Sequence, residues 1–149
     1  MLSSLADGTR TGGYGEGVPF AIVLTIILAV LAVFQAALAF GAPIGQYAWG
    51  GQHRVLPPRL RIGSVVAIVV YALIVVIAFD RLGAIDVFPE PFSEIAMWVI
   101  FGYFTLGIFM NAISRSKPER NVMTPVCIVL AVLSLFIALG VGSMATATA

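Results

Sequence analysis

The residues best suited to bind a ligand gather in the segment 41–61, which reads GAPIGQYAWGGQHRVLPPRLR. It contains the only histidine of the chain, His53, together with three arginines and four glycines. Arginine guanidinium groups and exposed backbone amides bind the oxygen atoms of phosphates and carboxylates. The segment therefore has the chemistry of a site for an anionic group.

Polar residues in the neighbouring apolar runs fall at a similar depth. Gln35 lies near the end of the run that precedes the segment, and Asn111 lies about one helical turn before Arg115. We expect these residues to form a pocket for a phospholipid headgroup, a phosphate or a carboxylate. The expected ligand-binding residues are Gln35, His53, Arg54, Arg61, Asn111 and Arg115. In the alternative interpretation the arginines only orient the protein and extend toward water.

Catalytic and metal-binding patterns are not found in the sequence. His53 has no neighbouring serine, cysteine or carboxylate with which to form a nucleophile and base pair. A single histidine cannot supply two axial haem ligands, and the single Cys127 excludes an internal disulfide and a multi-cysteine metal site. We therefore expect a protein that is not an enzyme and that uses no metal or cofactor.

The composition identifies the elements that must position these residues. Of the 149 residues, 60% are hydrophobic and 10% are charged. The mean hydropathy is +1.06, which is too apolar for an ordinary water-soluble domain. The formal net charge of +1 argues against a nucleic-acid partner, since phosphate backbones require a strongly basic surface. The chain is thus expected to be an integral membrane protein.

Four apolar segments are long enough to cross a bilayer, which requires about 20 residues. They predict an all-α, four-helix transmembrane bundle that forms a single domain. Thr124 and Pro125 suit the N-cap and first position of the last helix, and Pro118 and Asn121 favour a loop before it. The expected spans are residues 19–40, 62–79, 92–113 and 125–142.

The charges in the connections predict the orientation of the bundle. The first and third connections are basic, and the second contains Arg81 beside acidic residues. By the positive-inside rule, the first and third connections face the cytoplasm and both termini are extracytoplasmic. Arg81 is expected to pair with Glu94 across the second connection. The six basic residues of the first and third connections are Arg54, Arg59, Arg61, Arg115, Lys117 and Arg120.

The segment 41–61 is longer than a connection between adjacent spans requires. Its aromatic residues suit the membrane interface, so we expect an ordered cytoplasmic loop. Within the spans, small and polar residues at helical spacing predict contacts between helices, and Gly107 lies on one face with Tyr103 and Asn111. The expected helix-packing residues are Gly63, Ala67, Tyr71, Tyr103 and Gly107.

The strings GAPIGQYAWGGQHRVLPPRLR and NAISRSKPER resemble those of small four-span membrane proteins of bacterial, chiefly actinobacterial, genomes. The resemblance covers most of residues 19–140. It implies a multi-pass protein of the bacterial inner membrane and supplies no activity or functional residue.

Three functions remain open at this stage. The first is binding of a membrane lipid, small amphiphile or anion at the cytoplasmic face, or assistance to a membrane-protein partner. The second is an oligomeric channel or transporter, although no ionisable residue lies near the middle of a span. The third is catalysis on a lipid headgroup.

Overall fold

The computed structural model describes residues 17–89 and 91–141. Four long helices account for most of these residues, and two short 3-10 turns lie between the first two helices. Each long helix is apolar and long enough to cross a membrane, so the protein is an all-α integral membrane protein with four candidate spans. The elements are α1 (Val18–Ala39), η1 (Gly45–Tyr47), η2 (Trp49–Gly51), α2 (Pro58–Arg81), α3 (Phe92–Ala112) and α4 (Lys117–Ala138).

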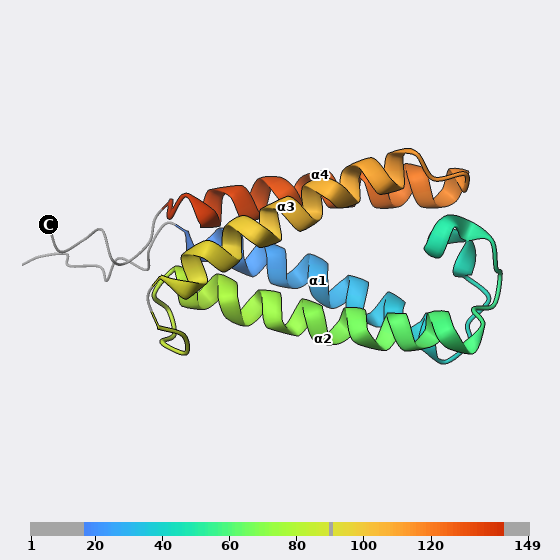
Figure 1. Ribbon diagram of the computed structural model, residues 1–149, viewed down its shortest axis with the longest axis horizontal. Helices are drawn as coiled ribbons and strands as arrows, with labels where there is room; N and C mark the ends of the chain where they lie inside the picture. The colour runs from blue at the N-terminus through green and yellow to red at the C-terminus, as the bar shows by residue number, and fades with distance from the viewer. Residues whose placement is uncertain (1–16, 90, 142–149) are drawn as a thin grey trace, which may run out of the picture.

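The helices pack as two hairpins, α1 with α2 and α3 with α4 (Figure 1). The hairpins lie close together at the end where α2 leads into α3, and they diverge toward the opposite end. We call these the narrow end and the wide end. The wide end carries the first connection, residues 40–57, and the third connection, residues 113–116. The turns η1 and η2 of the first connection lie between the diverging hairpins.

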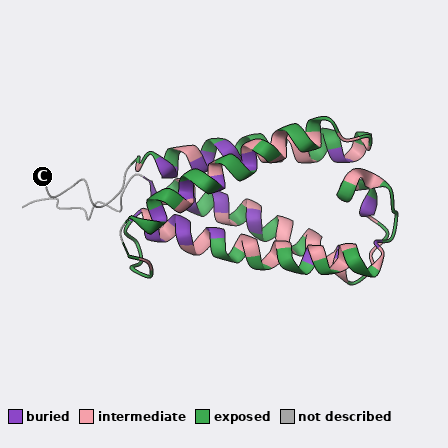
Figure 2. Cartoon of the chain, viewed as in Figure 1, coloured by how far each residue is buried: buried purple, intermediate pink, exposed green. Residues whose placement is uncertain are grey.

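The buried core occupies the narrow half of the bundle, where the purple residues of Figure 2 concentrate. All four helices contribute to it. Because lipid is as apolar as these side chains, close packing rather than exclusion of water stabilises the contacts. Its fully or nearly fully buried members include Ala21, Leu24, Leu28, Ile74, Ala78, Met97, Phe104, Leu130 and Ile137.

Polar contacts complete the narrow end. The Asp80 carboxylate accepts the backbone N–H groups of Val87 at 2.6 Å and of Phe88 at 3.1 Å. Arg81 Nη2 lies 3.7 Å from Glu94 Oε2 and donates to the carbonyl of Ala138 at 3.1 Å. The pairing of Arg81 with Glu94 expected from the sequence is therefore present.

The start of α4 differs from the sequence-based expectation. The helix begins at Lys117 rather than at Pro125, with Ser116 as its N-cap and Pro118 in its first turn. A proline is favoured there because the first N–H groups of a helix have no partner within it. Pro125 lies inside the helix, a position that membrane helices tolerate. The expectation that Pro118 and Asn121 lie in a loop was wrong.

The remaining bounds agree with the expected spans to within a few residues, except that α2 begins at Pro58 rather than Ile62. Arg59 and Arg61 therefore belong to the first turn of α2, with Pro58 at its first position. The last helix ends at Ala138 rather than at the expected Gly142. The expected extracytoplasmic termini concern residues outside the described part of the chain.

Candidate functional site

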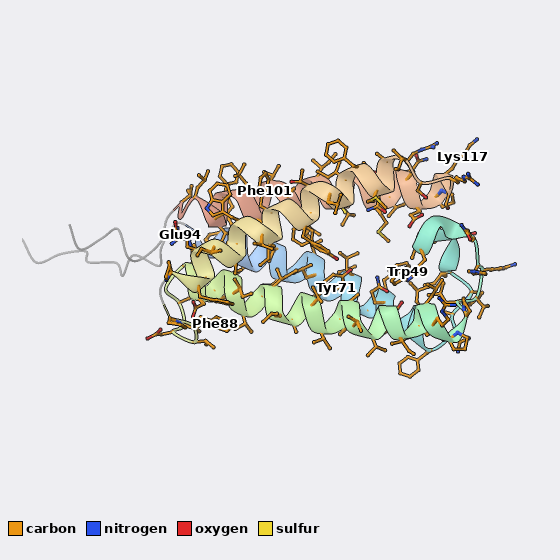
Figure 3. The ribbon with its side chains drawn as sticks, in the orientation of Figure 1. Trp49, Tyr71, Phe88, Glu94, Phe101 and Lys117 are labelled. Carbon is orange, nitrogen blue, oxygen red and sulfur yellow. The ribbon has the colours of Figure 1, made fainter. Side chains whose placement is uncertain are left out.

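A cavity of about 270 Å³ lies between the hairpins toward the wide end. All four helices and the first connection line it, and in Figure 3 the labelled Tyr71 and Trp49 lie between the hairpins. Its walls combine apolar side chains with hydroxyl, amide, thiol and carboxylate groups. The polar and aromatic lining residues are Phe34, Gln35, Tyr47, Trp49, Tyr71, Tyr103, Phe104, Asn111, Glu119 and Cys127.

The contact between α3 and α4 fixes the side chain of Asn111 in the cavity wall. Asn111 Nδ2 donates to the carbonyl of Gly107 at 2.8 Å and to Cys127 Sγ at 3.3 Å. A Cβ atom on Gly107 would lie 3.1 Å from the same sulfur atom. The glycine thus permits α4 to approach α3 closely, and both amide hydrogens of Asn111 have acceptors within the protein.

Gln35 presents a hydrogen-bond acceptor without a donor. Its Oε1 atom is buried and has no hydrogen-bond partner among the described residues. The side chain lines the cavity, where its amide group lies within hydrogen-bonding reach of the Tyr71 hydroxyl. An unsatisfied buried polar atom costs about 1–3 kcal/mol of stability. A ligand that donates a hydrogen bond here would remove that cost.

Glu119 joins the third connection to the first. This residue is buried, with 6% of its surface exposed. Its Oε1 accepts the backbone N–H of Gly50 at 3.2 Å, and its Oε2 accepts the hydroxyl of Ser114. The hydroxyl of Ser116 donates to the carbonyl of Gln46. These bonds hold the first connection against the start of α4.

The turn η2 requires an unusual backbone. Trp49, Gly50 and Gly51 all have positive φ, at 55°, 77° and 66°. This conformation costs about 1–2 kcal/mol for a residue such as tryptophan. It places the indole of Trp49 against Gly63 of α2, where a Cβ atom would lie 2.6 Å from the ring. Gly51 approaches the third connection so closely that a Cβ would lie 2.3 Å from Ser116 Cβ.

Two further hydrogen bonds end on backbone carbonyls of the first connection. The N–H of Gly45 donates to the carbonyl of Arg54 at 2.9 Å. Arg61 Nε donates to the carbonyl of Leu56 at 2.8 Å, and its guanidinium group packs against Gly41. Through these contacts the first connection folds into the bundle with a fixed shape.

The expected ligand-binding residues therefore divide into two groups. Gln35 and Asn111 line one cavity, as their similar depth in the sequence suggested. The basic residues do not line it: His53, Arg54 and Arg115 are exposed, and Arg61 is half-buried. An anion site on the surface formed by these residues stays a prediction.

The expected helix-packing residues also take different roles. Gly107 lies at the contact of α3 with α4, whereas Gly63 packs against an indole ring rather than a helix. Tyr71 and Tyr103 line the cavity. Ala67 is half-buried on α2.

Sequence reasoning missed Glu119, which is the only acidic residue in the cavity wall among residues 17–89 and 91–141. A signal for it exists, because Ser116 and Glu119 have the Ser-x-x-Glu spacing of a helix capping box. In this protein the Ser116 hydroxyl accepts the N–H of Glu119 at 3.5 Å. The glutamate carboxylate, however, binds the first connection instead of the N-cap backbone.

Two apolar grooves adjoin the cavity. The groove between α1 and α4 has a volume of about 330 Å³ and shares Leu31, Phe34, Tyr47, Met123 and Val126 with the cavity. The groove between α2 and α3 measures about 460 Å³ and shares Tyr103 with it. Val30 in the first groove is 65% exposed, so this groove reaches the lipid-facing surface.

Within residues 17–89 and 91–141, no group of three or more histidine, cysteine or acidic residues could hold a metal ion. Comparison with known proteins gives no match to a family model, a curated protein or a solved structure.

Proposed function

We propose that this membrane protein binds a small amphiphile between its two hairpins. The polar group of the ligand enters the cavity beside Gln35 and Tyr71, and its apolar chain lies in the groove between α1 and α4. One observation carries this proposal: a cavity wall with a buried, unsatisfied acceptor continues into an apolar groove open to lipid.

The dimensions and lining support a small ligand. Ligand pockets have volumes of about 300–1,000 Å³ and combine apolar walls with a few polar groups. The cavity of about 270 Å³ and the groove of about 330 Å³ are near the lower limit of this range. A single alkyl chain with a compact headgroup fits this description better than a two-chain phospholipid does.

The charges at the wide end support a cytoplasmic orientation for the site. The exposed basic residues Arg54, Arg115 and Lys117 lie at or beside the first and third connections. Under the positive-inside rule this end faces the cytoplasm. The sequence resemblance to bacterial proteins adds the inner membrane as the proposed location.

Quenching of tryptophan fluorescence tests the proposal. The chain has two tryptophans, so the W98F variant leaves Trp49 in the cavity wall as the only indole. In phosphatidylcholine nanodiscs, 8-bromooctan-1-ol should quench Trp49 saturably. Cys127→Phe fills the cavity and should weaken binding about tenfold or more, because it displaces the polar group of the ligand. Ile128→Phe is the matched control, since Ile128 is exposed on the same helix.

A quenching signal that rises linearly with bromooctanol, or that Cys127→Phe leaves unchanged, would contradict the proposal. Because Cys127 lies close to Gly107, a larger side chain at position 127 also presses on the contact between α3 and α4. The Met123→Trp variant, which keeps Trp49, provides a second test. Calorimetry measures the binding of the ligand to this variant. This substitution obstructs the junction between cavity and groove without changing the contact at Gly107.

The oligomeric channel or transporter remains the alternative hypothesis. Apolar side chains such as Leu24, Met97 and Ile137 fill the narrow half of the bundle. A pathway across the membrane would therefore have to run between copies of the chain.

A further inference from the structure

We infer that the ligand of the cavity is a cationic amphiphile, an alkylamine or alkylammonium ion, with Glu119 as its counter-charge. This inference rests on the proposed function and specifies the class of ligand. It reverses the sign of charge that the basic first connection suggested.

The charge of the cavity wall comes from Glu119. Glu119 is buried, and no lysine, arginine or histidine of the described residues lines the cavity. In the part of the chain that the structure describes, the only ion pair is that of Arg81 with Glu94 at the narrow end. Arg115, Lys117 and Arg120 follow one another closely around the start of α4, but all three are exposed. No basic side chain therefore neutralises the Glu119 carboxylate directly.

The hydrogen bonds of Glu119 leave acceptor capacity. Each carboxylate oxygen receives one neutral donor, the Gly50 N–H or the Ser114 hydroxyl. A carboxylate has about four lone-pair sites, so about two remain. The positive end of the α4 dipole stabilises the charge in part. A cation in the cavity would stabilise it further, because burial makes an unpaired charge costly.

Aromatic rings surround the same space. Six line the cavity, from α1, α2, α3 and the first connection. The face of an aromatic ring attracts cations, and quaternary ammonium groups are recognised in this way. The rings belong to Phe34, Tyr47, Trp49, Tyr71, Tyr103 and Phe104.

Gln35 allows the cavity to bind primary and secondary amines as well. Its buried Oε1 can accept an N–H from an ammonium group, and it has no other donor among the described residues. An anionic headgroup would meet the Glu119 carboxylate and the negative faces of the rings instead. The cavity therefore favours a positive headgroup over a negative one of the same size.

Three octyl compounds with different headgroups test this inference: octyltrimethylammonium, 1-octanol and octyl sulfate. Each competes with 8-bromooctan-1-ol for the W98F protein in phosphatidylcholine nanodiscs, and the Cys127→Phe protein gives the baseline for partitioning into lipid. We expect octyltrimethylammonium to bind about tenfold or more tightly than 1-octanol, and octyl sulfate to bind most weakly. Glu119→Gln should abolish the preference for the ammonium compound, so that its affinity falls to about that of 1-octanol measured on the same variant.

Glu94→Gln is the matched control, because Glu94 is a half-exposed carboxylate at the narrow end. This variant should bind the three compounds with the same order of affinity as the W98F protein does. The comparison of headgroups on W98F needs no change at Glu119, so it stands even if Glu119→Gln does not fold.

Three results would overturn the inference. Octanol or octyl sulfate binding at least as tightly as the ammonium compound would exclude a cationic site but leave the proposed function intact. Equal weakening of all three compounds by Glu119→Gln would show that Glu119 only holds the first connection. If none of the compounds competes and bromooctanol itself does not bind, the proposed function fails together with the inference.

Discussion

The two ends of this bundle are closed by different means. At the narrow end, side chains of all four helices pack against one another and bury a continuous core. At the wide end, the first connection takes the place of direct contact between the two hairpins and lies between them (Figure 1). Backbone groups of this connection bind Glu119 and Ser116, near the start of α4.

This difference explains where a cavity can form in a membrane protein. At the narrow end, buried apolar side chains of all four helices meet in one cluster, and the groove between α2 and α3 beside it has apolar walls. A loop must satisfy its own backbone donors and acceptors, so it cannot adapt its shape as closely to the helices. The wide end therefore retains a cavity with polar walls, whereas the narrow half is packed with apolar side chains.

The largest expected effect comes from the narrow end. Met97 is fully buried, so Met97→Ala should lower the free energy of unfolding by about 2–5 kcal/mol through the cavity that it creates. Thermal unfolding in a mild detergent measures the change. Val99→Ala on the exposed face of the same helix is the control and should change stability by no more than about 0.5 kcal/mol. Equal effects of the two substitutions would mean that the core does not close the narrow end.

A second substitution tests the wide end. Gly51→Ala should cost about 2–4 kcal/mol, because the new Cβ would meet Ser116 and the residue has positive φ. The first connection should then leave the bundle, and Cys127, the only cysteine, should react faster with a thiol reagent. Gly50 has a positive φ like Gly51, but a Cβ added there would lie in open space. Gly50→Ala therefore measures the free-energy cost of the backbone conformation alone. Identical labelling rates in both variants would refute the close contact with Ser116.

The N-cap of α4 should have a smaller effect. Ser116→Ala removes the cap and the bond to the Gln46 carbonyl, and should lower stability by about 1–2 kcal/mol. Faster labelling of Cys127 is expected here too, since the same hydroxyl holds the first connection. Thr105→Ala removes a hydroxyl that binds only its own helix, at the Phe101 carbonyl, and should leave the labelling rate unchanged. A faster rate in that control as well would remove the special role of Ser116.

The smallest effect is expected at the ion pair of the narrow end. Glu94→Gln should change stability by about 0–1 kcal/mol, because the Glu94 side chain is 48% exposed and its pair with Arg81 is screened by solvent. Unfolding at low and high salt measures this contribution. A loss greater than about 2 kcal/mol would show that polar contacts, rather than the core, hold the narrow end together.

The helices were largely predictable from the sequence because a span needs about 20 apolar residues, whatever its neighbours are. The start of α4 was missed because Thr124 and Pro125 imitate a helix start, whereas the capping pair Ser116 and Glu119 lies in a more polar stretch. Membrane helices can contain proline, so Pro125 carried less information than it would in a soluble protein.

The cavity was predictable only in part. The depths of Gln35 and Asn111 along their helices follow from residue spacing, and both side chains do line one cavity. The directions of the arginines do not follow from spacing, and Arg61 binds the carbonyl of Leu56. The positive φ of Trp49 was also not predictable, because nothing local distinguishes it from an ordinary tryptophan.

The bonds between the first connection and α4 have a consequence for biosynthesis. They join residues 69 and 70 positions apart in the chain. At a synthesis rate of about 5–20 residues per second, the partners of Gly50 and Gln46 emerge from the ribosome roughly 4–14 s after them. During this interval the α1–α2 hairpin enters the bilayer with its connection unanchored. The wide end is therefore anchored only when the start of α4 arrives, and the residues of α4 that complete the narrow end, such as Ile137, follow later.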